Sequence, residues 1–188
     1  GKGITKNEAE AVGWYKKAAE QGLPEAQFNL AICYDTGKGI TKNAAEAVRW
    51  YKKAAEQGNV SAQFNLAICY VTGNGITKNA TEAFRWYKKA AEQGMPEAQY
   101  SVAAYYGNGE AVAKNDAEAF GWLKKAAEQG LSEAQYSVAV LYEAGIGTPK
   151  NAAEAFKWYK KAAEQGNAAA QLKTGGYYGK GVGVAKDE

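Results

Sequence analysis

The chain has 188 residues, a net charge of +3 and no histidine. The mild charge, with both signs interleaved, does not indicate a nucleic-acid partner, and no apolar run is long enough to cross a bilayer. Without histidine, the commonest general base and metal ligand is missing and no Ser–His or Cys–His pair can form. We therefore expect a protein that is not an enzyme and has no cofactor or metal site. We also expect that it binds neither a membrane nor nucleic acid.

The sequence repeats with a period of 36 residues. Five tryptophans recur at this step, at Trp14, Trp50, Trp86, Trp122 and Trp158. Columns of tyrosine and glycine keep the same step without an insertion. A period of this length with little β-branched alternation is typical of stacked helix pairs, in which each repeat is stabilised by its neighbours. The sequence therefore predicts an all-α solenoid of antiparallel helix pairs.

Two helix types alternate along the chain, and we expect about ten helices in one repeat domain over 1–188. We call helices like PEAQFNLAICY inner and helices like WYKKAAEQG outer. An outer helix over 7–21 comes first, an inner helix over 168–178 comes last, and four inner–outer pairs lie between them, in 24–57, 60–93, 96–129 and 132–165. Neither end of the series resembles a polar cap. Because Asp187 stands where Asn should cap a further outer helix, we expect a piece of a longer solenoid or a frayed C-terminal end.

The first inner helix shows a clear apolar stripe. Ala26, Leu30, Cys33 and Tyr34 recur at helical spacing, which predicts that they are buried together. Gly37 follows, and glycine commonly ends a helix because it adopts positive φ without strain.

The outer helices carry a cap, a packing stripe and a charged face. Asn43 is a favoured N-cap, and Glu46 three residues later can complete a capping box. Trp50 and Tyr51, together with small alanines, predict a buried stripe between neighbouring helices. The lysines and glutamate of WYKKAAEQG fall outside this stripe. We interpret them as a solvated face, although a repeated ligand-binding set is the alternative.

These residues resemble the Sel1-like repeat (SLR) family, which is related to the tetratricopeptide repeats. The resemblance rests on the AEAQYNLG-type helix, the G-x-G turn and the EA-x-x-WY-x-KAAEQG helix, and it covers essentially the whole chain. It implies a right-handed α/α superhelix with the inner helices on the concave wall. It also implies a protein-interaction scaffold or adaptor, as in bacterial and eukaryotic members, many of the bacterial ones acting in the envelope or in host contact. The compartment stays open between bacterial cytoplasm, periplasm and secretion.

The tetratricopeptide frame places one set of residues on the concave wall, and this set is our candidate surface for a protein or peptide partner. Its members are Phe28, Asn29, Ile32, Phe64, Asn65, Ile68, Tyr100, Ser101, Tyr136 and Ser137. Aromatic side chains can anchor a partner while amides bond its backbone. The alternative is that the aromatics only pack between helices, and both roles can hold at once.

Two other features have competing interpretations. Arg49 and Arg85, beside the tryptophans, form either a small basic spot for an acidic partner or a tolerant surface position. Cys33 and Cys69 occupy equivalent places in neighbouring repeats, and equivalent Cα atoms should lie beyond disulfide range. We therefore expect two free, buried thiols.

Two alternatives to partner binding remain open on sequence grounds. Repeat ends without caps can stack, which would give a structural module that self-associates. The near-identity of the repeats is also typical of recent duplication or deliberate engineering, in which case no partner would have evolved.

Overall fold

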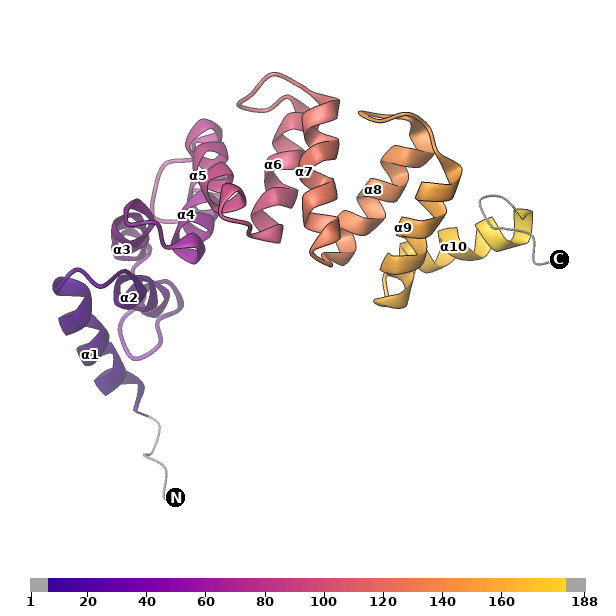
Figure 1. Cartoon of the computed structure of the whole chain (residues 1–188). Helices are drawn as coiled ribbons and strands as arrows, with labels where there is room; N and C mark the ends of the chain where they lie inside the picture. The colour runs from indigo at the N-terminus through magenta and orange to yellow at the C-terminus, as the bar shows by residue number, and fades with distance from the viewer. Residues whose placement is uncertain (1–6, 182–188) are drawn as a thin grey trace. The chain divides into compact units, whose positions relative to one another are not determined.

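The computed structural model describes residues 7–181, and this range contains ten α-helices of 13 residues each and no strand (Figure 1). The helices are α1 (Glu8–Glu20), α2 (Pro24–Thr36), α3 (Ala44–Glu56), α4 (Val60–Thr72), α5 (Ala80–Glu92), α6 (Pro96–Asn108), α7 (Asp116–Glu128), α8 (Ser132–Ala144), α9 (Ala152–Glu164) and α10 (Ala168–Lys180). The all-α class and the helix number confirm the prediction. The last helix runs two residues beyond the predicted end at 178.

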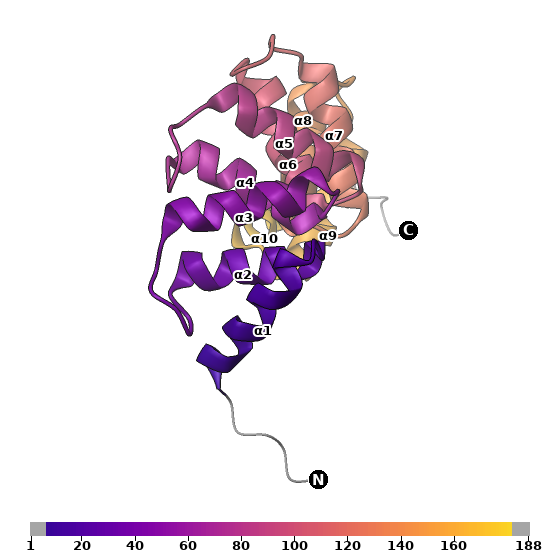
Figure 2. The ribbon, with the colours of Figure 1, turned by 90° about the vertical axis from the view of Figure 1, so that its left-hand side faces the viewer.

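The chain divides into two compact units, a first unit over 1–93 and a second unit over 94–188. The first unit contains α1–α5 and the second contains α6–α10. Within each unit every helix packs against the next one in sequence, and Figure 2 shows α2, α3 and α4 as successive layers of the first unit. Each unit is thus a short stack of helices. Asp187, on which the expectation about the C-terminal end rested, lies outside the described residues.

Each outer helix begins at an asparagine N-cap, as the sequence predicts. The side chain of Asn43 accepts a hydrogen bond from the backbone N–H of Glu46. Asparagine side chains cap the other outer helices in the same way, at Asn7, Asn79, Asn115 and Asn151. The return half of the capping box is not formed, because the N–H of Asn43 donates to the carbonyl oxygen of Tyr34 at 2.8 Å. Glu46 binds Arg49 instead.

The turns after α2, α4 and α8 each lie close to the outer helix that precedes them in the same unit. In the first unit, a Cβ atom built at Gly39 would overlap the backbone carbonyl of Glu8, so only glycine fits there. The third turn differs, because Ala111 stands at the equivalent position and has a φ of +58°. Alanine is strained in this region of backbone space by roughly 1–2 kcal/mol. Ala111 therefore marks a local departure from the repeat that the sequence interpretation missed.

Tryptophan and alanine form the cores between helices. Trp50, Trp86 and Trp158 are 4%, 2% and 5% exposed, which confirms their predicted packing role. Trp14 is 63% exposed and Trp122 is half-buried, so the prediction of five buried indoles is wrong. Among the described helices, the main packing partner of α1 is α2. The indole of Trp14 therefore has no second helix to cover it.

Buried glutamines connect successive repeats. The amide of Gln63 donates to the carbonyl oxygen of Ala55 at 3.1 Å, and its own oxygen accepts from Gln93 at 2.8 Å. In the second unit, Gln135 bonds Ala127 and Gln165 in the same way. Buried amides are unfavourable unless they are hydrogen-bonded. This relay satisfies them and fixes the spacing of neighbouring helix pairs.

Candidate partner-binding surface

The ten residues predicted to bind a partner lie on the inner helices, and we call them the inner stripe. The first unit carries six of them on α2 and α4, all half-buried. In the second unit α6 carries Tyr100 and Ser101 and α8 carries Tyr136 and Ser137. Tyr100 is exposed, with 37% of its surface accessible, and the other three are half-buried. The inner stripe is thus partly open to solvent in both units.

The aromatic side chains of the inner stripe pack against the following outer helix. The ring centroids of Phe28 and Tyr51 lie 5.9 Å apart, and those of Phe64 and Tyr87 lie 5.4 Å apart. In the second unit, Tyr136 packs on a tyrosine of α9 at 5.6 Å. Ring pairs at this separation stabilise the fold beyond their area burial. These side chains have a packing role, and part of each ring stays accessible.

Three of the four polar side chains of the inner stripe donate a hydrogen bond within their own helices. The amide of Asn65 donates to the carbonyl oxygen of Ser61 at 3.0 Å. The hydroxyl of Ser101 donates to the backbone carbonyl oxygen of Glu97 at 2.9 Å, and that of Ser137 does the same to Glu133 one repeat later. The two serine hydroxyls thus use their one donor and Asn65 uses one of its two N–H groups, while the oxygen atoms of all three side chains remain as acceptors.

A single substitution in the outer motif opens a hollow in the second unit. Leu123 stands where the other outer helices carry tyrosine, in WLKKAAEQG, so Tyr100 has no tyrosine ring to pack against. A hollow of about 320 Å³ lies here, lined by Tyr100, Leu123 and the α8 residues Ser137 and Leu141 among others. Gly107 also lines it and contributes no side chain. The sequence contained this signal as the departure from WYKK.

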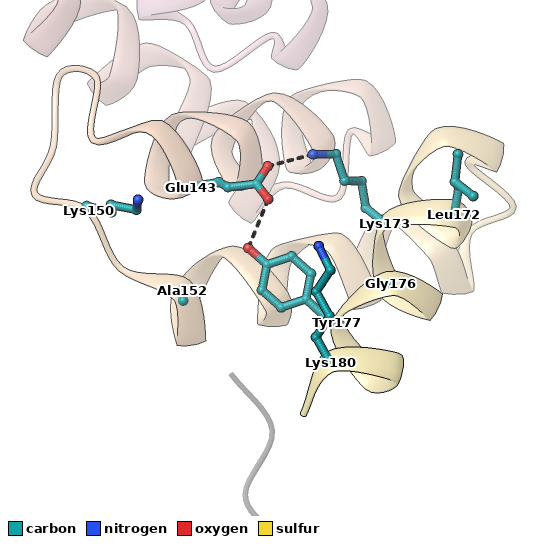
Figure 3. Close-up of a pocket in the computed structure, with 8 residues that line it drawn as sticks. All are labelled: Glu143, Lys150, Ala152, Leu172, Lys173, Gly176, Tyr177 and Lys180. Carbon is teal, nitrogen blue, oxygen red and sulfur yellow. Dashed lines mark hydrogen bonds and ion pairs between the residues drawn. The ribbon is translucent and has the colours of Figure 1, made fainter. Parts of the chain in front are cut away.

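A second hollow, of about 380 Å³, lies between the turn before α9 and helix α10 (Figure 3). At its centre the carboxylate of Glu143 accepts hydrogen bonds from Lys173 at 2.7 Å, Tyr159 at 2.9 Å and Tyr177 at 3.3 Å. The bond from Lys173 is the main reason that the pKa of Glu143 lies below its ordinary value, against the opposing effect of burial. Burial and the neighbouring carboxylate raise the pKa of both tyrosines. All three groups therefore keep their ordinary charge states at neutral pH.

Sequence reasoning missed this cluster around Glu143. The signal was available at two positions of the 36-residue repeat. At the first position, Lys173 is the only cation, and the other repeats carry Asn or Ser there. The column of Glu143 contains one other acid, Asp35, in the first unit. Asp35 accepts a hydrogen bond from Asn74 at 3.0 Å and faces no lysine equivalent to Lys173, since Asn65 stands there.

The first unit has a groove of about 370 Å³ between α1 and α2. Asn29 and Ile32 of the inner stripe line it, together with Tyr15 and Cys33. Both cysteines are free, as predicted, but Cys33 is only half-buried, whereas Cys69 is buried. Burial, with a smaller contribution from Asp35, raises the pKa of Cys69 to about 11. Neither thiol has the lowered pKa of a reactive cysteine.

The positive charges of the two arginines on the outer helices are each paired with a nearby glutamate. Arg49 forms an ion pair with Glu46 at 2.7 Å and lies over the ring of Trp50 at 4.8 Å. Arg85 makes the same two contacts in the next repeat. These contacts favour a structural surface position over a basic spot for an acidic partner, because each charge already has a partner.

Within residues 7–181, no group of three or more His, Cys, Asp or Glu side chains is arranged to hold a metal ion. None of the helices described in that range is both long and apolar enough to span a membrane.

Comparison with known families matches the Sel1 repeat model six times, over residues 1–23, 24–59, 60–95, 96–131, 132–167 and 168–188. The four complete matches coincide with the inner–outer helix pairs. The two terminal matches are shorter, and they contain the lone outer helix α1 and the lone inner helix α10. No match is found among curated proteins.

Similar solved structures share this repeat. A protective antigen of uropathogenic Escherichia coli with an SLR fold is 38% identical, with a TM-score of 0.88; the match covers 92% of this chain but only 37% of the antigen. A Sel1 repeat protein from Oxalobacter formigenes is 42% identical, with a TM-score of 0.82, over 94% of this chain and 70% of the other. Helicobacter pylori cysteine rich protein B is 25% identical, with a TM-score of 0.55, over 69% and 92%.

Proposed function

Because the chain belongs to the Sel1 repeat family, whose members are generally protein-interaction scaffolds, we propose that it is a non-enzymatic scaffold that binds a partner protein or peptide on the inner stripe. One observation carries the proposal: the hollows of 320–380 Å³ described above all lie on inner helices and include residues of the inner stripe or of the same columns. The outer helices, in contrast, carry a smaller hollow of about 150 Å³ on α7 and charged side chains, of which Arg49 and Arg85 pair with glutamates one turn away.

The chemistry of the inner stripe suits an extended peptide. Half-buried rings offer flat apolar area without a large entropy loss, because they are already held by the following outer helix. Amide and hydroxyl oxygens beside them can accept the N–H groups of a peptide backbone. Packed helices supply a rigid base, so little ordering is needed when a partner binds.

Selection from a random peptide library displayed on phage tests the proposal. We expect each selected peptide to bind about tenfold more weakly to one of two variants, Asn65→Ala/Ile68→Ala if it binds the first unit or Tyr100→Ala if it binds the second, since each variant removes accessible inner surface. Phe64 is avoided because its ring packs on Tyr87 and its loss would weaken the fold. Lys52→Ala, on the outer face, is the matched control. Binding that is lost in the control but kept in both inner variants would reject the site.

Self-association is a second candidate, favoured by the apolar side chains exposed at the two ends of the helix series. Trp14 is 63% exposed on α1 and Leu172 is 80% exposed on α10. Mutual burial of two such faces would be a head-to-tail contact, which forms open chains when it does not close. Sedimentation velocity at increasing concentration should show larger species that Leu172→Lys abolishes. A monomer at all concentrations would reject this role.

A further inference from the structure

The second unit departs from the regular repeat at two neighbouring places on its inner face, and α8 contributes to both. Ser137 and Leu141 line the hollow next to Leu123, and Glu143 lies at the centre of the hollow next to α10. A ligand that crosses α8 would therefore contact both hollows.

The hollow next to Leu123 is suited to one apolar side chain. Its walls include Leu123, Leu141 and Ile146, and the ring of Tyr100 stands at its side without an aromatic partner on α7. Ile146 is 43% exposed although it is a large apolar residue. Burial of such surface against a partner is favourable by about 25 cal/mol per Å² before the costs of association.

The hollow next to α10 has an excess of positive charge. Lys150, Lys173 and Lys180 line it, and Glu143 is the only carboxylate among its lining residues. Figure 3 shows Lys150 on one side of Glu143 and Lys173 on the other. Lys173 is engaged by Glu143 at 2.7 Å, whereas Lys150 and Lys180 make no ion pair within residues 7–181. Two lysines are thus free to receive an anionic group beside a cluster that is already ordered.

We propose that the second unit binds a peptide segment of a partner protein that carries an apolar side chain and, about three residues away, a carboxylate. The apolar group enters the hollow next to Leu123, and the carboxylate lies between Lys150 and Lys180. The spacing follows from an inner-helix separation of roughly 10 Å and about 3.3 Å per residue of extended chain. This inference rests on the proposed scaffold function and specifies its ligand.

A charged surface alone would also attract small anions, but the exposed apolar groups favour a peptide. Leu172 also lines the hollow next to α10 and is 80% exposed. Apolar surface next to unpaired lysines matches a segment that offers both kinds of group, whereas a free inorganic anion would leave the apolar surface in water.

Two variants test the two hollows separately without truncating a packed side chain. Leu123→Tyr restores the residue that the other outer helices carry, so its ring should fill the hollow against Tyr100 as Tyr51 packs on Phe28. Lys150→Glu/Lys180→Glu reverses the charge of two exposed side chains. Both variants should keep the helical fold, which circular dichroism and thermal unfolding will verify.

The peptides selected on the parent chain are the probe. We expect them to be enriched in an apolar residue and an Asp or Glu about three positions apart, and to bind about tenfold more weakly to each variant. Replacing the acidic residue of a selected peptide by lysine should restore its binding to the Lys150→Glu/Lys180→Glu variant. The Asn65→Ala/Ile68→Ala variant in the first unit is the control and should leave these peptides unaffected.

Several outcomes would overturn the inference. Peptides that lose binding in the Asn65→Ala/Ile68→Ala variant but not in either second-unit variant would keep the scaffold function and reject this site. Inorganic phosphate that binds the lysines, with peptides insensitive to both second-unit variants, would indicate a small-anion site instead. If no peptide is enriched on the parent over the two second-unit variants, the inference fails, and the scaffold proposal then depends on the variants of the inner stripe.

Discussion

The two units share the same alternation of inner and outer helices but present different inner faces. In the first unit, Phe28 and Phe64 each pack on a tyrosine of the next outer helix, and the acid Asp35 contacts an asparagine. In the second unit, Leu123 provides no ring for Tyr100 to pack against, and the carboxylate of Glu143 accepts hydrogen bonds from a lysine and two tyrosines. The asparagine caps and the glutamine relay are the same in both units. The two units therefore differ mainly at side chains that are accessible to solvent. The glutamines that join one repeat to the next are the same in both units.

The largest effect should come from the tryptophans, which test whether the same motif has the same role at every repeat. We expect Trp86→Ala to lower the free energy of unfolding by about 3–5 kcal/mol, because the indole is fully packed. Trp14→Ala removes the same group from an exposed site and should change stability by less than about 0.5 kcal/mol. Urea unfolding followed by circular dichroism measures both. Equal losses would contradict the burial difference.

The glutamine relay should be equally important in the two units. Gln63→Ala and Gln135→Ala each remove two hydrogen bonds of the relay, so each should lower stability by about 1–3 kcal/mol. Gln171→Ala is the control, because that side chain is exposed and makes only the bond to Ala163. A loss of stability for only one of the two variants would show that the relay contributes unequally to the two units.

The third turn should respond in the opposite direction to its neighbours. Ala111→Gly relieves a φ of +58° and should stabilise the chain by about 0.5–1 kcal/mol, which thermal unfolding will detect. Gly147→Ala should destabilise it by more than this, since the added Cβ atom would overlap the backbone of Asp116. If Ala111→Gly lowered the melting temperature, the alanine would be compensated by contacts that outweigh its strain.

The smallest effect should be the pH dependence of the Glu143 cluster. A carboxylate whose pKa is lowered by folding stabilises the fold above its unfolded pKa and loses this contribution as the pH falls through its folded pKa. Glu143→Gln should therefore be less stable than the parent at neutral pH, and the difference should shrink below about pH 4.3. Urea midpoints across pH measure this difference. In a Lys173→Gln background the difference should be smaller at every pH, because the main partner of the carboxylate is gone.

The sequence predicted the features that depend on local pattern. Helix positions follow from apolar periodicity and asparagine caps, both of which act within one turn of helix, and the structure has them within two residues of the predicted bounds. The return bond of Glu46 was not predictable, because Tyr34 competes for the N–H of Asn43 from the preceding helix. The exposure of Trp14 depends on which helices are present beside it and not on its own motif.

The candidate surface was less accessible to sequence reasoning than the fold. The repeat pattern was sufficient to predict the inner stripe. The hollow next to Leu123 arises because a tyrosine ring is absent there, and no sequence motif marks such an absence. The cluster around Glu143 joins residues on α8, α9 and α10 that are individually ordinary. Only their arrangement in space gives them a shared role.

The relay of glutamines has a consequence for how the molecule comes apart under tension. Each bond between two glutamines joins residues 30 positions apart within one inner–outer pair. The bond from the inner glutamine to the preceding outer helix, as from Gln63 to Ala55 and from Gln135 to Ala127, ties that pair to its neighbour and to nothing farther along the chain. Pulling on the two ends loads these ties in series, and an outer repeat can peel away while those behind it stay folded. The length of the molecule under force should then increase in steps of one repeat, with unfolding starting at the terminal repeats.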